Sequence, residues 1–169
     1  TEDQDPFAII LGCSDSRAPS EIIFDQGLGD LFVIRVAGNI VAPTQIGSIE
    51  FAVEKFGTRL VVVMGHSRCG AILATLDGLG QPLEAQSRSL LSIVDRIRPS
   101  LISLDRDQDT ETLLQQAVHA NIHSSVHQLQ HESKILKNLV KKGNLLVLGA
   151  EYSLDTGIVN FFDKLPQEK

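Results

Sequence analysis

The stretch Phe7-Ala-Ile-Ile-Leu11, followed directly by Gly12-Cys-Ser-Asp-Ser-Arg17, decides the fold of this chain. A short apolar run that ends at a glycine is typical of a strand buried on both faces of a sheet. Similar runs, rich in β-branched residues, occupy residues 31–34, 60–64 and 145–148. We therefore expect four buried strands, each followed by polar or small residues.

Helical patterns lie between these runs. Apolar residues recur at spacings of three and four from residue 43 to residue 56, and Gly57 ends the pattern. We expect a second helix over residues 84–98 with Pro99 as its stop, a loop over 101–110, and a helical stretch with one break over 111–142. This alternation predicts an α/β fold with a mostly parallel central sheet flanked by helices, in a single domain over residues 1–169.

Composition and charge exclude several classes of function. The formal net charge of −6 and the lack of a basic cluster argue against a nucleic-acid partner. No apolar run approaches the roughly 20 residues that span a bilayer, so we expect no membrane partner. The two cysteines do not form a secreted disulfide framework, which favours a cytoplasmic location. The short polar start suggests a missing N-terminal segment, so organelle targeting stays open.

Candidate metal ligands follow two of the expected strands. Cys13 comes after the first strand, and His66 and Cys69 come after the third. In proteins with parallel sheets, bound molecules and ions lie beyond the carboxyl ends of the strands. We therefore expect these three side chains to meet at that edge of the sheet. Two thiolates and one imidazole suit tetrahedral zinc and leave a fourth position for water, as in catalytic sites. The alternative is a disulfide between Cys13 and Cys69, which leaves His66 without a role.

Several longer motifs resemble the β-class carbonic anhydrases, in particular the plant-type branch. The matching segments are Gly12-Cys-Ser-Asp-Ser-Arg17, Gly29-Asp-Leu-Phe-Val-Ile-Arg35, Ala37-Gly-Asn-Ile-Val41 and Gly65-His-Ser-Arg-Cys-Gly70. The match runs in order from about Gln4 to Leu76, and residues 149–157 resemble the family's final strand and hairpin, which would form the C-terminal edge of the sheet.

The resemblance implies an activity, a cofactor and partners. It implies Zn²⁺ on Cys13, His66 and Cys69, and reversible hydration of carbon dioxide to bicarbonate by zinc-bound hydroxide. It also implies a homodimer or a dimer of dimers with active sites near the subunit interface. In the family, N-terminal helices embrace the partner subunit, and we expect that helical segment to be absent from this sequence.

The resemblance also suggests roles for residues around the metal. Arg17 would orient Asp15 so that its carboxylate accepts a hydrogen bond beside the metal, and in a closed state Asp15 would itself bind zinc. A simple surface salt bridge is the alternative for this pair. The expected substrate pocket consists of Gln4, Phe32, Phe51 and Gly70. Solvent exposure is the alternative for Gln4, and core packing is the alternative for the two phenylalanines.

Two questions stay open at this stage. The same ligand set would also suit hydrolysis of a carbon dioxide analogue such as carbon disulfide, or a zinc-stabilised module without turnover. A series of histidines at spacings of four lies on a predicted helix, beside an apolar stripe that favours a packed face over a second metal site. The histidines are His119, His123, His127 and His131, and the stripe is Val118, Ile122, Val126 and Leu129.

Overall fold

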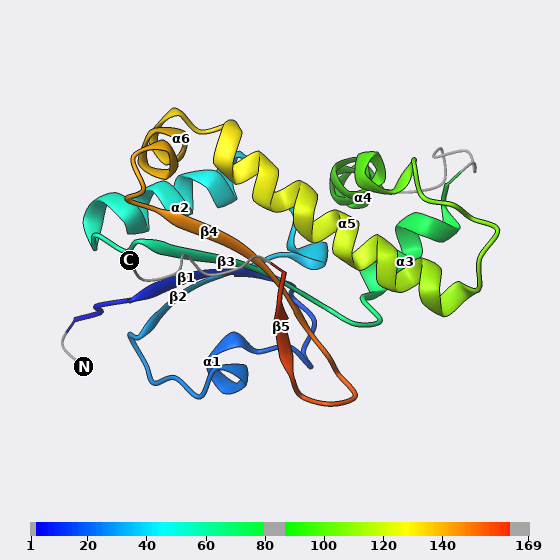
Figure 1. Cartoon of the computed structure of the whole chain (residues 1–169), viewed down its shortest axis with the longest axis horizontal. Coiled ribbons are helices and arrows are strands. Elements are labelled where there is room, and N and C mark those ends of the chain that lie inside the picture. The colour runs from blue at the N-terminus through cyan, green and yellow to red at the C-terminus, as the bar shows by residue number, and fades with distance from the viewer. Residues whose placement is uncertain (1–2, 80–86, 163–169) are drawn as a thin grey trace.

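A five-stranded sheet forms the centre of the computed structural model, which describes residues 3–79 and 87–162 (Figure 1). The strands are β1 (Ala8–Gly12), β2 (Leu31–Arg35), β3 (Leu60–His66), β4 (Leu146–Tyr152) and β5 (Val159–Phe161). Their order across the sheet is β2-β1-β3-β4-β5. The first four strands are parallel, and β5 pairs antiparallel with β4 as a C-terminal edge hairpin. The predicted α/β fold is confirmed.

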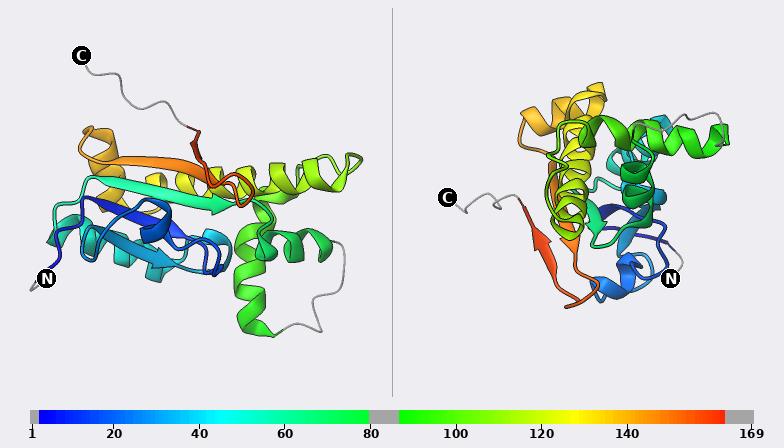
Figure 2. Two further views of the ribbon diagram at one scale, coloured as in Figure 1. Left: turned by 90° about the horizontal axis from the view of Figure 1, so that it is seen from below. Right: turned by 90° about the vertical axis from the view of Figure 1, so that its right-hand side faces the viewer.

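Helices cover both faces of this sheet. They are α1 (Ser20–Ile23), α2 (Pro43–Lys55), α3 (Gly70–Asp77), α4 (Arg88–Leu101), α5 (Thr110–His131) and α6 (Lys134–Lys141), with a 3-10 turn η1 (Ala37–Asn39). In Figure 1, α2, α5 and α6 lie on one face of the sheet and α1 on the other. The views of Figure 2 place α3 and α4 beyond the carboxyl ends of the strands. Of the helices in the described ranges, none is long and apolar enough to cross a membrane.

Some helix boundaries differ from the sequence prediction. The break in the long helical stretch is confirmed, since α5 ends at His131 and α6 begins at Lys134. The stop at Pro99 is wrong, because α4 continues to Leu101. Burial of Ile97 and Leu101 holds this last turn together, and a proline near a helix end disrupts few backbone bonds. The expected start of α4 at residue 84 lies outside the described residues. The short elements α1, η1 and α3 were not predicted.

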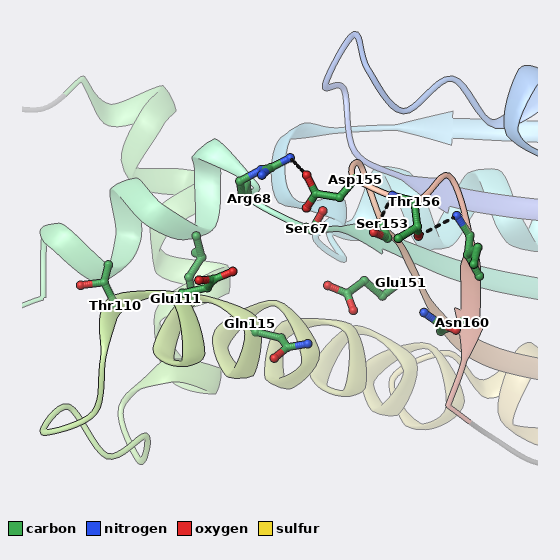
Figure 3. A pocket seen from close by; sticks show the side chains of 12 residues that line it. Ser67, Arg68, Thr110, Glu111, Gln115, Glu151, Ser153, Asp155, Thr156 and Asn160 are labelled. Carbon is green, nitrogen blue, oxygen red and sulfur yellow. Dashed lines mark hydrogen bonds and ion pairs between the residues drawn. The ribbon is translucent and has the colours of Figure 1, made fainter.

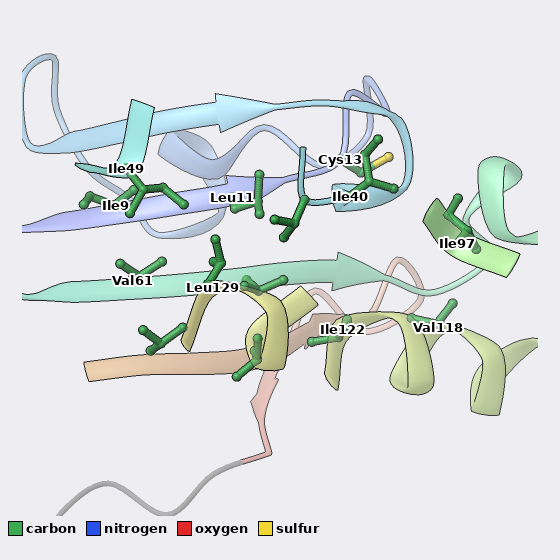
Figure 4. Close-up of a cluster of buried hydrophobic side chains, with 14 of the residues drawn as sticks. Ile9, Leu11, Cys13, Ile40, Ile49, Val61, Ile97, Val118, Ile122 and Leu129 are labelled. Atoms are coloured by element: carbon green, nitrogen blue, oxygen red, sulfur yellow. The ribbon is translucent and has the colours of Figure 1, made fainter. Parts of the chain in front are cut away.

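The larger hydrophobic core lies between the sheet and the helices α2 and α5. Alternate residues of the central strands point into it, as Ile9, Leu11 and Val61 do in Figure 4. The predicted apolar stripe of α5 is confirmed: Val118, Ile122, Val126 and Leu129 are all buried. Cys13 belongs to the same cluster at the carboxyl end of β1, so the core extends up to the expected metal site.

Two glycines bring α5 unusually close to the sheet. A Cβ atom on Gly65 would lie 2.5 Å from Cδ1 of Ile122, and one on Gly149 would lie 2.9 Å from its Cγ2. Larger residues at these positions would push the helix away from β3 and β4. Because Gly65 immediately precedes His66, this close packing fixes the helix directly beside a candidate metal ligand.

Candidate metal centre

The three predicted metal ligands meet at the carboxyl edge of the sheet. Cys13 follows β1, His66 is the last residue of β3, and Cys69 precedes α3. Their ligand atoms all lie within 4.8 Å of one another, and all three residues are buried. The two cysteines are free thiols whose sulfur atoms are 3.9 Å apart, which excludes the disulfide alternative.

The donor set and its spacing fit zinc. Two Zn–S bonds of about 2.3 Å at a tetrahedral angle separate the sulfurs by about 3.8 Å, close to the observed distance. Nδ1 of His66 lies 3.0 Å from the carbonyl oxygen of Ser67, which can only accept a hydrogen bond, so Nδ1 carries the proton. Nε2 of His66 is buried and has no hydrogen-bond partner among the described residues. An unprotonated, unpaired nitrogen facing two thiols is the arrangement that a metal ion satisfies.

The thiols themselves share a hydrogen bond. This contact lowers the pKa of Cys13 and raises the pKa of Cys69. The backbone N–H of Gly38 also donates to the sulfur of Cys13 at 3.3 Å, which further favours the thiolate. The fold therefore favours the thiolate form of Cys13. A bound cation would also favour ionisation of Cys69.

Asp15 and Arg17 form a bidentate pair next to this cluster. Arg17 donates from Nε to Oδ1 of Asp15 at 2.9 Å and from Nη2 to Oδ2 at 2.8 Å. The same Oδ2 lies 3.7 Å from Nε2 of His66, so the carboxylate borders the metal position. Hydrogen bonding to the guanidinium lowers the pKa of Asp15 well below its usual value. This contact with the ligand group sets the pair apart from a simple surface salt bridge.

Comparison with known proteins assigns the family. A family profile described as "Carbonic anhydrase" matches residues 8–159, which is most of the chain. The chain belongs to the β-carbonic anhydrase family. It is 40% identical over 164 residues to a carbonic anhydrase of Mycolicibacterium smegmatis, covering 94% of this chain and 76% of that protein. It is 37% identical over 154 residues to carbonic anhydrase 2 of Mycobacterium tuberculosis, covering 91% of this chain and 73% of that protein.

The fold agrees with solved structures of the same class. The structure of the β-carbonic anhydrase CcaA superposes with a TM-score of 0.85 at 27% identity, covering 96% of this chain and 82% of that one. The predicted zinc cofactor is confirmed for this family member, in which Cys13, His66 and Cys69 form a cluster that could hold the metal.

Arg35 supports the metal loop of this carbonic anhydrase, and sequence reasoning assigned it no role. It donates from Nε to the carbonyl of Cys13 at 2.9 Å and from Nη2 to the carbonyl of Asp15 at 2.6 Å. One guanidinium therefore fixes the backbone of both a metal ligand and the neighbouring carboxylate. Arg35 stands at the end of an apolar run in the sequence, but it binds backbone carbonyl groups. Every residue has such a group, so no sequence pattern indicates these contacts.

Gly38 is the second residue that sequence reasoning missed. It adopts a left-handed conformation with φ of +70°, and a Cβ atom would lie 2.7 Å from Cδ1 of Ile97. Only glycine therefore allows the turn that aims its N–H at Cys13. From α5, Asn121 donates to the Gly38 carbonyl at 2.8 Å. The predicted ligand Cys13, which follows β1, is thus held through η1 by a helix far away in the sequence.

The C-terminal hairpin fixes the other metal loop. Arg68 forms an ion pair with Asp155 at 2.7 Å (Figure 3). Ser67 Oγ accepts a hydrogen bond from the Leu154 backbone N–H at 2.9 Å. Beside these contacts lies a cavity of about 750 Å³ between α5 and the hairpin. None of the three predicted ligands lines this cavity, although Ser67 and Arg68, which do line it, lie between His66 and Cys69.

The expected substrate pocket is divided between the two ends of the sheet. Gly70 follows Cys69 directly, and a Cβ atom there would meet open space. Phe32, in contrast, pairs in register with Ile9, four residues or about 13 Å along β1 before Cys13. Gln4 lies further away still, against Gly29, which comes two residues before β2.

Phe51 lies at the same distant end as Phe32. The ring centroids of these two residues are 6.3 Å apart, and that of Phe56 is 5.7 Å from Phe51. Phe51 remains 51% exposed, so it is not simply packed in the core. One chain thus brings Gly70 to the metal centre but keeps Gln4, Phe32 and Phe51 away from it.

Proposed function

We propose that this protein catalyses the reversible hydration of carbon dioxide to bicarbonate and a proton, with Cys13, His66 and Cys69 as the metal ligands and Asp15 and Arg17 as the assisting pair. The observation that carries the proposal is the buried three-ligand cluster bordered by a carboxylate that an arginine already holds. A group of three ligands within the described residues suits a catalytic site better than a closed structural one.

Zinc held by two thiolates and one imidazole would supply the Lewis acidity that ionises a bound water, but less strongly than a three-histidine site does, so hydration should rise through mildly alkaline pH. The residues around the metal position orient the reacting groups. Asp15 is ionised because Arg17 lowers its pKa, so its carboxylate can only accept hydrogen bonds. It accepts a hydrogen bond from the reacting water, which aims the oxygen lone pair at carbon dioxide, and the released proton passes to solvent. Asp15 keeps this orientation because Arg17 binds both of its oxygens.

Gly70 contributes a backbone donor on the substrate side. It is the first residue of α3, so its N–H has no partner within the helix, and its surroundings are open. This N–H donates to an oxygen of carbon dioxide or bicarbonate and orients the carbon toward the reacting water. The helix dipole adds partial positive charge at this position, which favours the product anion.

A second copy of the chain completes the apolar side of the pocket. A two-fold axis perpendicular to the strands places the amino end of one sheet beside the carboxyl end of the other, so Gln4, Phe32 and Phe51 of one subunit line the metal centre of its partner. Exposed apolar side chains near β2 support burial of this surface: Ile22 is 78% and Leu28 87% exposed in the single chain. The functional unit is a homodimer, or a dimer of dimers.

The proposal extends to the domain and its location. One continuous core runs from the sheet to the metal site, which supports a single catalytic domain. The two free thiols support a reducing compartment, in agreement with a cytoplasmic location.

Stopped-flow measurement of carbon dioxide hydration tests the activity. Zinc-loaded protein should accelerate hydration, whereas chelator-treated protein should not, and readdition of zinc should restore the rate. Hydration by the zinc-loaded protein at the spontaneous rate would show the proposed activity to be wrong. Hydrolysis of carbon disulfide under the same conditions would then identify the alternative substrate.

Complementation between two inactive variants tests the shared site. One carries Cys13→Ser, and the other carries Gln4→Ala with Phe51→Ala. After subunit exchange, a mixed dimer holds one site with an intact metal end and an intact partner end, so an equimolar mixture should recover about one quarter of wild-type activity. If each site is built by one chain, the mixture will be no more active than the average of the two variants.

A further inference from the structure

The structure divides the histidine series of α5 into two pairs. Nε2 of His119 lies 2.8 Å from Oε2 of the buried Glu151, and its ring centroid lies 4.6 Å from that of Phe162. The ring of His123 also packs on Phe162, at 5.2 Å. Both imidazoles therefore contribute to the packing of the fold: His119 through a hydrogen bond to Glu151, and both rings through contact with Phe162.

His127 and His131 behave differently. Both are exposed, and their rings stack on each other with centroids 4.1 Å apart and an interplanar angle of 19°. Residues four apart on a helix lie one above the other on the same face. The two imidazoles therefore project together into solvent, where small rotations of either ring can direct one nitrogen of each toward a common point.

A hydrogen bond prepares one ring for coordination. Nδ1 of His131 lies 2.8 Å from the carbonyl oxygen of His127, so Nδ1 carries the proton and Nε2 is free to bind. Histidines that bind metals nearly always donate their other ring N–H in this way, because the partner fixes the tautomer and the ring orientation. The contact is intrahelical and does not depend on the rest of the fold.

We propose that His127 and His131 form a two-histidine chelate for a divalent late transition metal ion, separate from the catalytic centre. Imidazole pairs suit Ni²⁺, Cu²⁺ and Zn²⁺, and water fills the remaining positions. The chelate is remote from the first metal, since Ile122 packs against the residue before His66 and His131 lies nine residues, or about 13 Å, further along α5. The proposal is independent of the hydration activity.

Titration of untagged, zinc-loaded protein with Ni²⁺ by isothermal calorimetry tests the site. Ni²⁺ is preferred to Cu²⁺ as the probe because copper can oxidise thiols. We expect one Ni²⁺ per chain to bind while zinc analysis shows the first metal retained. His127→Gln and His131→Gln should each weaken Ni²⁺ binding by about tenfold or more.

His123→Gln is the matched control. It lies on the same helix, also four residues from His127, but its ring packs on Phe162 rather than on a second imidazole. It should leave Ni²⁺ affinity unchanged. Absence of Ni²⁺ binding by the wild-type protein at millimolar concentration would overturn the proposal. Equal weakening by His123→Gln, or no weakening by His131→Gln, would also overturn it.

Discussion

The two ends of the sheet differ in how far a single chain buries and holds the side chains there. At the carboxyl end, the metal ligands are buried and their loops are bound by Arg35, by Gly38 and by the C-terminal hairpin. At the amino end, Phe51 is half exposed. One chain therefore fixes the predicted metal ligands and the Asp15–Arg17 pair, whereas the aromatic residues at the amino end remain partly open.

This difference shows which parts of a site need a single folded chain and which parts need only an apolar surface. Ligands and a charged pair need fixed distances, which a single folded chain provides through hydrogen bonds within its own core. An apolar wall for a small uncharged substrate needs only surface, which a second copy can supply. Substitutions at the carboxyl end should therefore affect the metal and its chemistry most directly.

The largest effect is expected from loss of a metal ligand. Cys13→Ser or Cys69→Ser should abolish zinc binding and hydration together, because each removes one of the three proposed ligands among the described residues and leaves the buried Nε2 of His66 unpaired. Metal analysis of the purified variants measures this directly. Zinc at full stoichiometry in both variants would contradict the ligand assignment.

A large effect with zinc retained is expected from Arg17→Gln. Asp15 would lose its bidentate partner, and hydration should fall by about two orders of magnitude, the range typical of a misplaced orienting group. Arg96→Gln is the control, because Arg96 also donates a side-chain hydrogen bond, to the carbonyl of Ser92 at 2.6 Å, and lies on α4 outside the metal loops. Equal losses in the two variants would mean that Arg17 has no special role beside the metal.

A moderate effect is expected at Arg35. Arg35→Lys keeps the positive charge but cannot span the carbonyls of Cys13 and Asp15, so zinc affinity should fall by about tenfold. Competition with a chromophoric chelator measures the affinity. Arg59→Lys is the control, because Arg59 also donates to a carbonyl, that of Val53, outside the metal loops. Unchanged affinity in Arg35→Lys would show that the loop holds its shape without the arginine.

The smallest effect is expected at the start of α5, the helix that supports η1. Asp109 accepts a hydrogen bond from the backbone N–H of Thr112, which lowers its pKa in the folded state. The hydrogen bond to Asp109 therefore stabilises the folded state fully above the pKa of about 3.9 that this carboxyl has in the unfolded chain. The stabilisation is lost as the pH falls through the lower pKa that Asp109 has in the folded protein. The difference in melting temperature between wild type and Asp109→Ala should therefore shrink from pH 6 to pH 3. A difference that is independent of pH would exclude a charge contribution from this cap.

Local patterns predicted the parts of the fold that depend on neighbouring residues. The apolar runs identified β1 to β4, the stripe of α5 identified its buried face, and the helical stretch over 111–142 was expected to contain one break, which separates α5 from α6. The end of α4 was predicted wrongly, because tertiary burial of Ile97 and Leu101 outweighs the usual effect of Pro99. Short elements such as α1 and η1 have too few residues to show a period.

The sequence by itself determined the chemistry of the metal centre. Cysteine and histidine at the ends of two parallel strands can meet at one edge of the sheet, and this rule needs only the order of the strands. The tertiary structure decided what supports and completes that centre. Arg35 and Gly38 act through backbone atoms that no sequence pattern marks, and the register of β1 with β2 places Phe32 far from Cys13 in the same chain. Such distances depend on strand pairing and helix packing, which join residues that the linear sequence keeps apart.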